Sequence, residues 1–147
     1  MDKTIILTVS KHKGNTMNLV RNVSDKLNNV EIYDCLNEQN DIDLSKYKFV
    51  GVASGIYFGD IDKSLYDILK KYKIKDIFLI ITSRSNNPKY LDMVKEKLNK
   101  IDVNVIDGFY YVDKKKHIFL KFLNPKNNLT EKEINKAVDF VDNIINC

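Results

Sequence analysis

The chain has 147 residues, of which 44% are hydrophobic, and its formal net charge is +4. This length suffices for one domain with one core. We expect a single domain over residues 1–147, because no repeat, low-complexity tract or linker-like segment divides the chain. The first residues do not resemble a secretory signal, and no segment approaches the about 20 apolar residues of a membrane span. We therefore expect a cytoplasmic protein without membrane insertion.

The positive charge is spread over the chain and does not by itself indicate nucleic-acid binding. One lysine-rich segment, Lys70–Lys75, falls at a predicted helix end, where cations complement the helix dipole. Another, Asp113–His117, is predicted to be a loop. Lysines occur throughout the rest of the chain, so we interpret them as solvated surface residues and expect no nucleic-acid partner.

The two cysteines, Cys35 and Cys147, do not form a CxxC pair. Their spacing from His12 and His117 does not match a metal site either. We interpret both cysteines as reduced structural thiols and expect no bound metal.

Five segments of the sequence predict β-strands. Three are apolar on successive residues, as in strands buried on both faces of a sheet. The other two alternate or are interrupted by polar residues, as in edge strands. In chain order the five are Thr4–Val9, Val30–Cys35, Phe49–Ala53, Ile77–Ile81 and Val103–Val112, with the second and the last as the edge candidates.

Segments with the helical period of 3.6 residues alternate with these strands. Their apolar faces, in chain order, are Val20, Val23 and Leu27; Ile61, Leu65, Ile68, Leu69 and Tyr72; Leu91, Val94 and Leu98; and Ile134, Ala137, Val138, Val141, Ile144 and Ile145. Thr130 and Glu133 have the spacing of a capping box, and Asn86–Pro88 offers a cap followed by a first helical proline. Only a short segment of undecided structure, near residues 41–47, follows the second strand.

This order of elements predicts an α/β fold in three layers, a doubly wound sheet of five parallel strands with helices on both faces. Ligands of such sheets bind beyond the carboxyl ends of the strands, where the strand order reverses. The loops to consider therefore follow the first, third and fourth strands, at Ser10–Thr16, Ser54–Asp60 and Ser83–Tyr90.

The first loop has the composition of an anion site. Ser10, Asn15 and Thr16 bring short polar side chains, Gly14 permits a tight turn, and a helix is predicted to begin at Asn15 or Thr16. An ordinary strand-to-helix turn with an Asn or Thr cap explains the same residues equally well.

Several phosphate-handling classes are excluded by what the first loop lacks. It has neither a P-loop Lys-Ser/Thr pair nor a GxGxxG motif, it contains no cysteine, and no acidic pair ends the first strand. No set of serine, cysteine and carboxylate is legible around His12. A phosphate that is bound and not hydrolysed is the interpretation that remains.

The second loop places three large apolar residues, Ile56, Tyr57 and Phe58, where a loop is usually polar. A flat aromatic ligand stacked on them would cover this surface. The alternative, that Ile56 and Phe58 reach into the core, stays open for one of these residues.

Together the loops resemble the flavodoxin family. "SKHKGNT" is similar to its phosphate loop, with Thr16 closing the motif, and "GVASGIYFGDIDKSLYDIL" is similar to flavodoxin-like segments with a Ser-x-Ile-Tyr-x-Gly pattern. The tail "FLNPKNNLTEKEINKAVDFV" resembles the end of the same group. The resemblance implies strand order 2-1-3-4-5, bound FMN, and Tyr57 or its neighbours flanking the isoalloxazine.

The resemblance also implies a role for each loop. The first would hold the phosphate, the second one side of the ring, and the third the pyrimidine edge or the second face, although Asn87 could equally be a helix cap. The predicted cofactor-binding residues are Ser10, Lys11, His12, Lys13, Gly14, Asn15, Thr16, Ser54, Gly55, Ile56, Tyr57, Phe58, Gly59, Ser83, Arg84, Asn86, Asn87 and Tyr90.

Two further expectations concern the redox properties. In several flavodoxins the peptide before a Gly-Asp pair flips when the flavin is reduced, and Phe58, Gly59 and Asp60 match that sequence pattern. We therefore expect Gly59 to set the potential of the first reduction. Typical flavodoxins are acidic, whereas Lys11, His12 and Lys13 crowd the phosphate loop of this chain. This positive charge predicts that the second reduction has a less negative potential than in an acidic relative. It also predicts that the redox partner binds through an acidic surface.

The favoured function is that of a monomeric one-electron carrier, which has no substrate of its own and meets redox partner proteins transiently. One alternative is a flavodoxin-like flavin oxidoreductase acting on a quinone, NAD(P)H or a protoporphyrinogen-type substrate. Another is an interaction module that keeps the fold without the flavin.

Overall fold

The computed structural model describes residues 2–11, 14–112 and 129–146, which form a parallel sheet with helices on both sides. The strands are β1 (Lys3–Val9), β2 (Val30–Asp34), β3 (Tyr47–Gly55), β4 (Asp76–Ser83) and β5 (Asn104–Val112). Their order in the sheet is β2-β1-β3-β4-β5, and every neighbouring pair is parallel. The predicted fold class and strand order are confirmed, and β2 and β5 lie at the two edges as expected.

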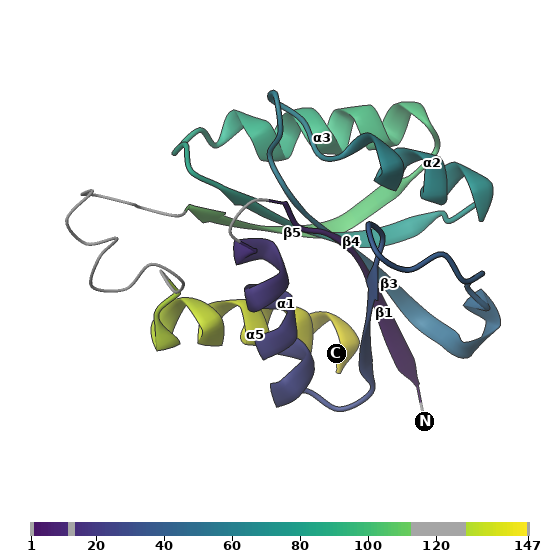
Figure 1. Cartoon of the computed structure of the whole chain (residues 1–147), viewed down its shortest axis with the longest axis horizontal. Coiled ribbons are helices and arrows are strands. Elements are labelled where there is room, and N and C mark those ends of the chain that lie inside the picture. The colour runs from purple at the N-terminus through teal and green to yellow at the C-terminus, as the bar shows by residue number, and fades with distance from the viewer. Residues whose placement is uncertain (1, 12–13, 113–128, 147) are drawn as a thin grey trace.

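The helices form the two outer layers. They are α1 (Asn15–Lys26), α2 (Lys63–Lys71), α3 (Lys89–Lys100) and α5 (Glu131–Ile145). Figure 1 shows α2 and α3 on one face of the sheet and α1 and α5 on the other. A short 3-10 helix, Leu44–Lys46, occupies the segment of undecided structure. Among the described residues, no helix is both long and apolar enough to cross a membrane.

The successive apolar residues of the central strands supply two separate cores. Alternate side chains of a strand point to opposite faces of the sheet. Ile5 and Leu7 of β1 therefore join the core beneath α2 and α3, whereas Ile6 joins the core beneath α1 and α5. Each fully buried side chain of this size contributes about 1.5–3 kcal/mol relative to an exposed one. Burial on both faces is the physical reason for the unbroken apolar runs.

Strands β3 and β4 extend beyond their predicted ends, and these extensions position the site. The apolar runs stop at Ala53 and Ile81, but the ladder continues to pair Ser54 with Ile81 and Gly55 with Thr82. The sheet thus delivers small polar residues to its carboxyl edge.

Helix α3 begins one residue later than predicted. Pro88 is the N-cap and not the first helical residue, and the Asn87 side chain accepts a hydrogen bond from the N–H of Lys89 at 3.1 Å. The side chain of asparagine makes such a bond to the main chain two residues on and closes a turn there. The predicted loop Asp113–His117, His12, Lys13 and Cys147 lie outside the described residues.

Candidate functional site

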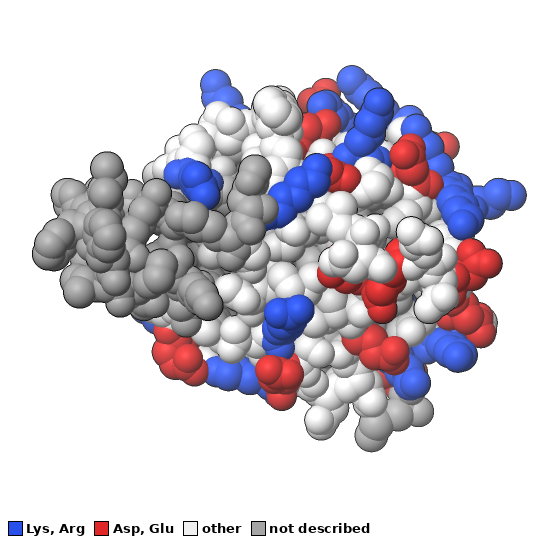
Figure 2. All heavy atoms as spheres, in the orientation of Figure 1, with Lys and Arg blue, Asp and Glu red and all other residues white. Residues whose placement is uncertain are grey.

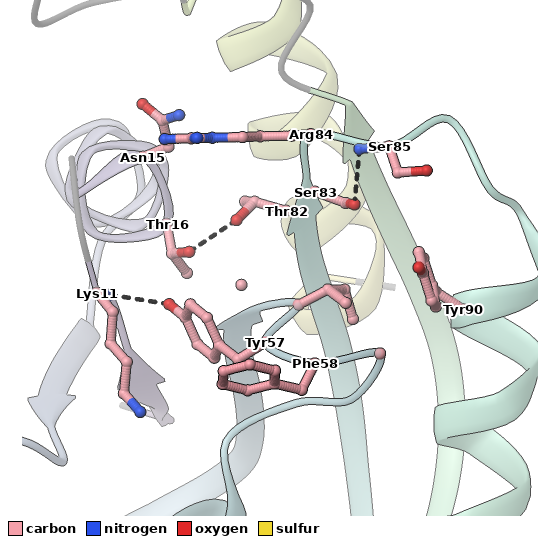
Figure 3. A pocket seen from close by; sticks show the side chains of 13 residues that line it. Lys11, Asn15, Thr16, Tyr57, Phe58, Thr82, Ser83, Arg84, Ser85 and Tyr90 are labelled. Carbon is pink, nitrogen blue, oxygen red and sulfur yellow. Dashed lines mark hydrogen bonds between the residues drawn. The ribbon is translucent and has the colours of Figure 1, made fainter.

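A cavity of about 430 Å³ lies at the carboxyl edge of the sheet, a volume within the usual range for small-molecule sites. The three loops selected from the sequence supply its wall (Figure 3). The lining residues are Lys11, Asn15, Thr16, Gly55, Ile56, Tyr57, Phe58, Gly59, Thr82, Ser83, Arg84, Ser85 and Tyr90.

The first loop brings the start of helix α1 to this cavity. Gly14 precedes the helix with a φ of 73°, in the left-handed region that glycine tolerates. The Ser10 hydroxyl accepts a hydrogen bond from the N–H of Met17 at 3.1 Å, and the carbonyl of Gly14 accepts one from Asn18 at 2.9 Å. The first turn of α1 contains no acidic residue, so its positive dipole end is not neutralised from within the turn.

Two buried threonines join α1 to β4 beside the helix start. The hydroxyl oxygens of Thr16 and Thr82 lie 2.7 Å apart, and the two residues are only 2% and 5% exposed. This hydrogen bond fixes the position of the helix start relative to the sheet. The polar end of the cavity is therefore built before any ligand arrives.

Tyr57 of the second loop is held on the opposite side. Its hydroxyl accepts a hydrogen bond from the backbone N–H of Lys11 at 2.8 Å (Figure 3). A Cβ atom at Gly55 would lie 2.7 Å from the Tyr57 hydroxyl oxygen, so only glycine leaves room for this position of the ring. Desolvation raises the pKa of Tyr57, which keeps its hydroxyl protonated at neutral pH.

Phe58 and Gly59 form a tight turn at the tip of the same loop. Tyr57 and Asp60 exchange two backbone hydrogen bonds, of 2.7 and 3.2 Å, around them. Phe58 has a φ of 54° and Gly59 one of 81°, and positive φ at both central residues is the pattern of type I′ turns. Glycine tolerates the positive φ of Gly59 without a steric cost.

The side chain of Phe58 is fully exposed, at 108%. The alternative in which Phe58 enters the core is therefore wrong. Ile56, by contrast, packs partly against the core beneath α2 and α3. A bulky residue with positive φ is strained by about 1–2 kcal/mol, so the tip of the loop combines an exposed aromatic ring with a strained backbone.

The carboxylate of Asp60 ties the loop to helices α2 and α3. Its two oxygens accept hydrogen bonds from the Tyr66 hydroxyl at 2.8 Å and the Lys97 ammonium at 2.7 Å. Burial, followed by the hydrogen bond to Asp60, raises the pKa of Tyr66. The next carboxylate, Asp62, caps α2 by accepting the N–H of Ser64 at 3.0 Å.

Asp62 also pairs with Lys11, whose ammonium lies 2.6 Å away. Burial opposes ionisation of Asp62, but its hydrogen bonds with Lys11 and Ser64 bring its pKa below the ordinary value. The bond to Asp62 raises the pKa of Lys11. The Lys11 ammonium, 5.0 Å from the centre of the Tyr57 ring, thus points away from the start of α1. Lys11 thus belongs to the phosphate loop and lines the cavity, but its charge is paired with Asp62.

The third loop closes the remaining side. The Ser83 hydroxyl accepts the N–H of Ser85 at 3.1 Å, and the Tyr110 hydroxyl donates to the carbonyl of Ser85 at 2.7 Å. Arg84 lines the cavity from this loop and Tyr90 from the first turn of α3, whereas the Asn87 side chain closes the turn that precedes α3.

The predicted site residues divide into three groups. Those that line the cavity are Lys11, Asn15, Thr16, Gly55, Ile56, Tyr57, Phe58, Gly59, Ser83, Arg84 and Tyr90. Those that lie behind its surface or beside it are Ser10, Gly14, Ser54, Asn86 and Asn87, while His12 and Lys13 lie outside the described residues.

Thr82 and Ser85 line the cavity but were missed from the sequence. Thr82 directly follows the apolar run of β4, so a signal for it existed: a polar residue at the carboxyl end of a buried strand. No sequence pattern marks Ser85 in this way, because only the path of the loop in the folded chain brings it to the cavity.

No protein-family model matches the chain. An uncharacterized protein of Methanocaldococcus jannaschii is 28% identical over 149 residues, which cover 97% of this chain and 98% of that protein.

Solved structures resemble the chain over most of its length. Flavodoxin 1 of Bacillus cereus has a TM-score of 0.66 and 13% identity, over 98% of both chains. The fold is flavodoxin-like. NAD(P)H:quinone oxidoreductase of Methanothermobacter marburgensis has a TM-score of 0.61 and 6% identity, over 99% of this chain and 97% of that chain. A flavoprotein of Lactobacillus acidophilus, solved in complex with FMN, has a TM-score of 0.58 and 19% identity, over 75% of this chain and 93% of that chain.

The flavodoxin-like fold explains why the cavity lies where it does. The strand order reverses between β1 and β3, and the loops after these two strands diverge and leave a crevice. Two of the three loops around the cavity follow β1 and β3, and the third follows the neighbouring strand β4. The cavity therefore occupies the switch point of the fold.

Proposed function

We propose that this protein binds FMN at the cavity and transfers single electrons between redox proteins. The observation that carries the proposal is a cavity at the β1/β3 switch point with a polar, cationic end and an aromatic end. FMN is bound at this place in the flavodoxin-like fold. The Lactobacillus acidophilus flavoprotein, which shares the fold, was solved with FMN.

The residues present fit the two ends of FMN. The start of α1, with Asn15 and Thr16 in the cavity wall, suits the phosphate. Tyr57 and Phe58 offer aromatic surface to the ring system. None of the described residues that line the cavity is acidic, so no carboxylate repels a phosphate dianion there.

FMN, when bound, supplies the redox chemistry, and the protein supplies position and electrostatics. Tyr57 stays protonated and fixed to Lys11, so its ring is a rigid surface. Gly59, at the tip of the turn, has a backbone that can change conformation at low cost. Phe58 stands at the rim, where it would shield the ring from water.

The purified protein should bind FMN, give a flavin absorption spectrum and prefer FMN to riboflavin at least tenfold. Hydrogen bonds from the helix start to a charged phosphate contribute about 1.5–3 kcal/mol each, and about 1.4 kcal/mol corresponds to a factor of ten. The measurement is a titration of the apoprotein with each flavin, followed by fluorescence. Equal affinities would defeat the phosphate assignment, and a protein that takes up neither flavin would be an interaction module.

A second candidate function is a flavin oxidoreductase acting on a quinone, NAD(P)H or a protoporphyrinogen-type substrate. A second hollow of about 570 Å³ shares Lys11, Tyr57 and Phe58 with the cavity and offers room beside it. The quinone oxidoreductase of Methanothermobacter marburgensis shares the fold. Steady-state turnover of NAD(P)H with a quinone by the FMN-loaded protein would favour this candidate; the carrier predicts negligible turnover without a partner protein.

The partner proteins of a carrier, their acidic surfaces and the monomeric state are also proposals. On the face shown in Figure 2, lysines and acidic residues are interspersed along the edge over α2 and α3. An acidic partner would bind more weakly as salt increases, because exposed charges are screened.

A further inference from the structure

Among the residues that the structure describes, two cations line the cavity, and they differ in their partners. Lys11 is 2.6 Å from the Asp62 carboxylate, which lies outside the cavity wall. Its charge is therefore compensated and directed away from the start of α1. Arg84 follows β4 and is exposed. No ion pair within the described part of the chain includes Arg84.

The Arg84 side chain extends toward the polar end of the cavity. In Figure 3 its guanidinium reaches across from the β4 loop toward Asn15 at the start of α1, above the pair formed by Thr16 and Thr82. The positive end of the α1 dipole and the guanidinium thus lie on the same side of the cavity. With no acidic residue among the described lining residues, this end is the most favourable place for an anion.

We propose that Arg84 determines specificity by pairing with the phosphate of the bound ligand, and so selects a phosphorylated flavin over its unphosphorylated form. The proposal deepens the proposed function and rests on it. A guanidinium presents a planar fork of donors that matches two phosphate oxygens, and a bidentate pair of this kind is stronger than a point-charge contact. Exposed ion pairs are weak in water, but a ligand seated in the cavity would exclude water from this one.

The test compares Arg84→Gln with Lys89→Gln, which removes the same charge from an exposed residue of the same region outside the cavity wall. The dissociation constants of FMN and riboflavin are measured for the wild type, these two variants and Arg84→Lys. We expect Arg84→Gln to weaken FMN about tenfold and to change riboflavin less than twofold. Lys89→Gln should change each affinity less than twofold, and Arg84→Lys should recover part of the loss of FMN affinity.

Two results of the flavin titrations would overturn the proposal. An unchanged FMN affinity in Arg84→Gln would show that the phosphate does not use this residue. An equal loss of FMN and riboflavin affinity would mean that Arg84 contacts the flavin ring or stabilises the loop, and does not contact the phosphate. Urea unfolding of the two apoproteins separates these outcomes from a folding defect, because the exposed Arg84 side chain should leave the unfolding midpoint unchanged.

Inorganic phosphate separates this proposal from the proposed function. If the wild type binds no flavin, the proposed function fails, and the thermal shift produced by phosphate on the apoprotein then decides the role of Arg84. A rise in Tm for the wild type that is absent in Arg84→Gln supports an Arg84-dependent anion site. The same response in both proteins, or none, overturns it.

Discussion

The β1–α1 loop and the β3–α2 loop face each other across the cavity, and they are fixed by different kinds of interaction. In the first, buried hydroxyl groups connect the helix start to the sheet, as the 2.7 Å contact between Thr16 and Thr82 shows. In the second, a strained turn is tied to its surroundings by the partly exposed carboxylates of Asp60 and Asp62. Buried hydrogen bonds respond little to salt or pH, whereas ion pairs near the surface respond to both. The polar end is therefore insensitive to salt and pH, whereas the ion pairs that hold the second loop depend on both.

The largest expected effect is at the polar end. Replacing Thr82 with Val removes one hydroxyl of the buried pair and leaves that of Thr16 without this partner. A buried polar group that loses its partner costs about 1–3 kcal/mol. We expect the free energy of unfolding, measured by urea denaturation, to fall by about 2 kcal/mol, within this range.

The double variant Thr16→Val/Thr82→Val tests whether the pair acts as a unit. Replacing both partners with apolar groups of the same shape can be nearly neutral, so the double variant should be more stable than the sum of the two single losses predicts. Strictly additive losses would show that the two hydroxyls do not depend on each other.

Most residues at the polar and aromatic ends of the cavity could be predicted, because the sequence patterns that mark them are local. A glycine before a helix start, hydroxyl residues beside it, and three apolar residues in a loop can all be read along the chain. The strand order cannot be read in the same way, and it came from the resemblance. The direction of Lys11 is a different case. Its partner, Asp62, is distant in sequence, and only the fold brings the two loops together.

Ser10 shows a second limit of the sequence. Its hydroxyl was expected at the phosphate; it accepts a hydrogen bond from the N–H of Met17, and a hydroxyl that accepts one bond can also donate one to a ligand. A serine before a helix gives the same sequence pattern whether its hydroxyl caps the helix or binds a ligand. Thr82 was missed for a related reason, since a strand end and the loop after it cannot be divided by pattern alone.

A smaller effect is expected at the tip of the aromatic loop. In Gly59→Ala the new Cβ atom meets nothing within 4 Å, so the cost arises from the φ of 81° alone. We expect a loss of about 1 kcal/mol of stability. If the backbone of Gly59 changes conformation on reduction, the potential of the first reduction should also shift by tens of millivolts, since about 59 mV corresponds to 1.4 kcal/mol for one electron. The measurement is a redox titration of the FMN-loaded protein.

Phe58→Gly is the matched control at the neighbouring position. Phe58 has a φ of 54° and a fully exposed side chain, so glycine relieves strain without removing buried surface. The variant should be more stable than the wild type by about 1 kcal/mol. An unchanged potential in Gly59→Ala would contradict the role of that peptide, while a less stable Phe58→Gly would contradict the strain assigned to the turn.

The smallest effect is expected at the ion pair between Asp62 and Lys11, and it should depend on pH. The folded state lowers the pKa of Asp62, so its contribution to stability is present above the pKa of the unfolded chain, about 3.9. This contribution is lost as the pH falls through the lower folded pKa. Asp62→Asn keeps a side chain that caps α2 well and should lower stability at pH 7 by less than about 1 kcal/mol. The difference in free energy of unfolding between wild type and variant, measured by urea denaturation, should shrink as the pH is lowered from 7 to 3.

The control is Asp41→Asn, which breaks a 3.4 Å ion pair whose Asp41 side chain is 87% exposed. It should have a smaller effect at pH 7. A difference for Asp62→Asn that grows toward acid pH would mean that burial, and not Lys11, dominates the energetics of this carboxylate.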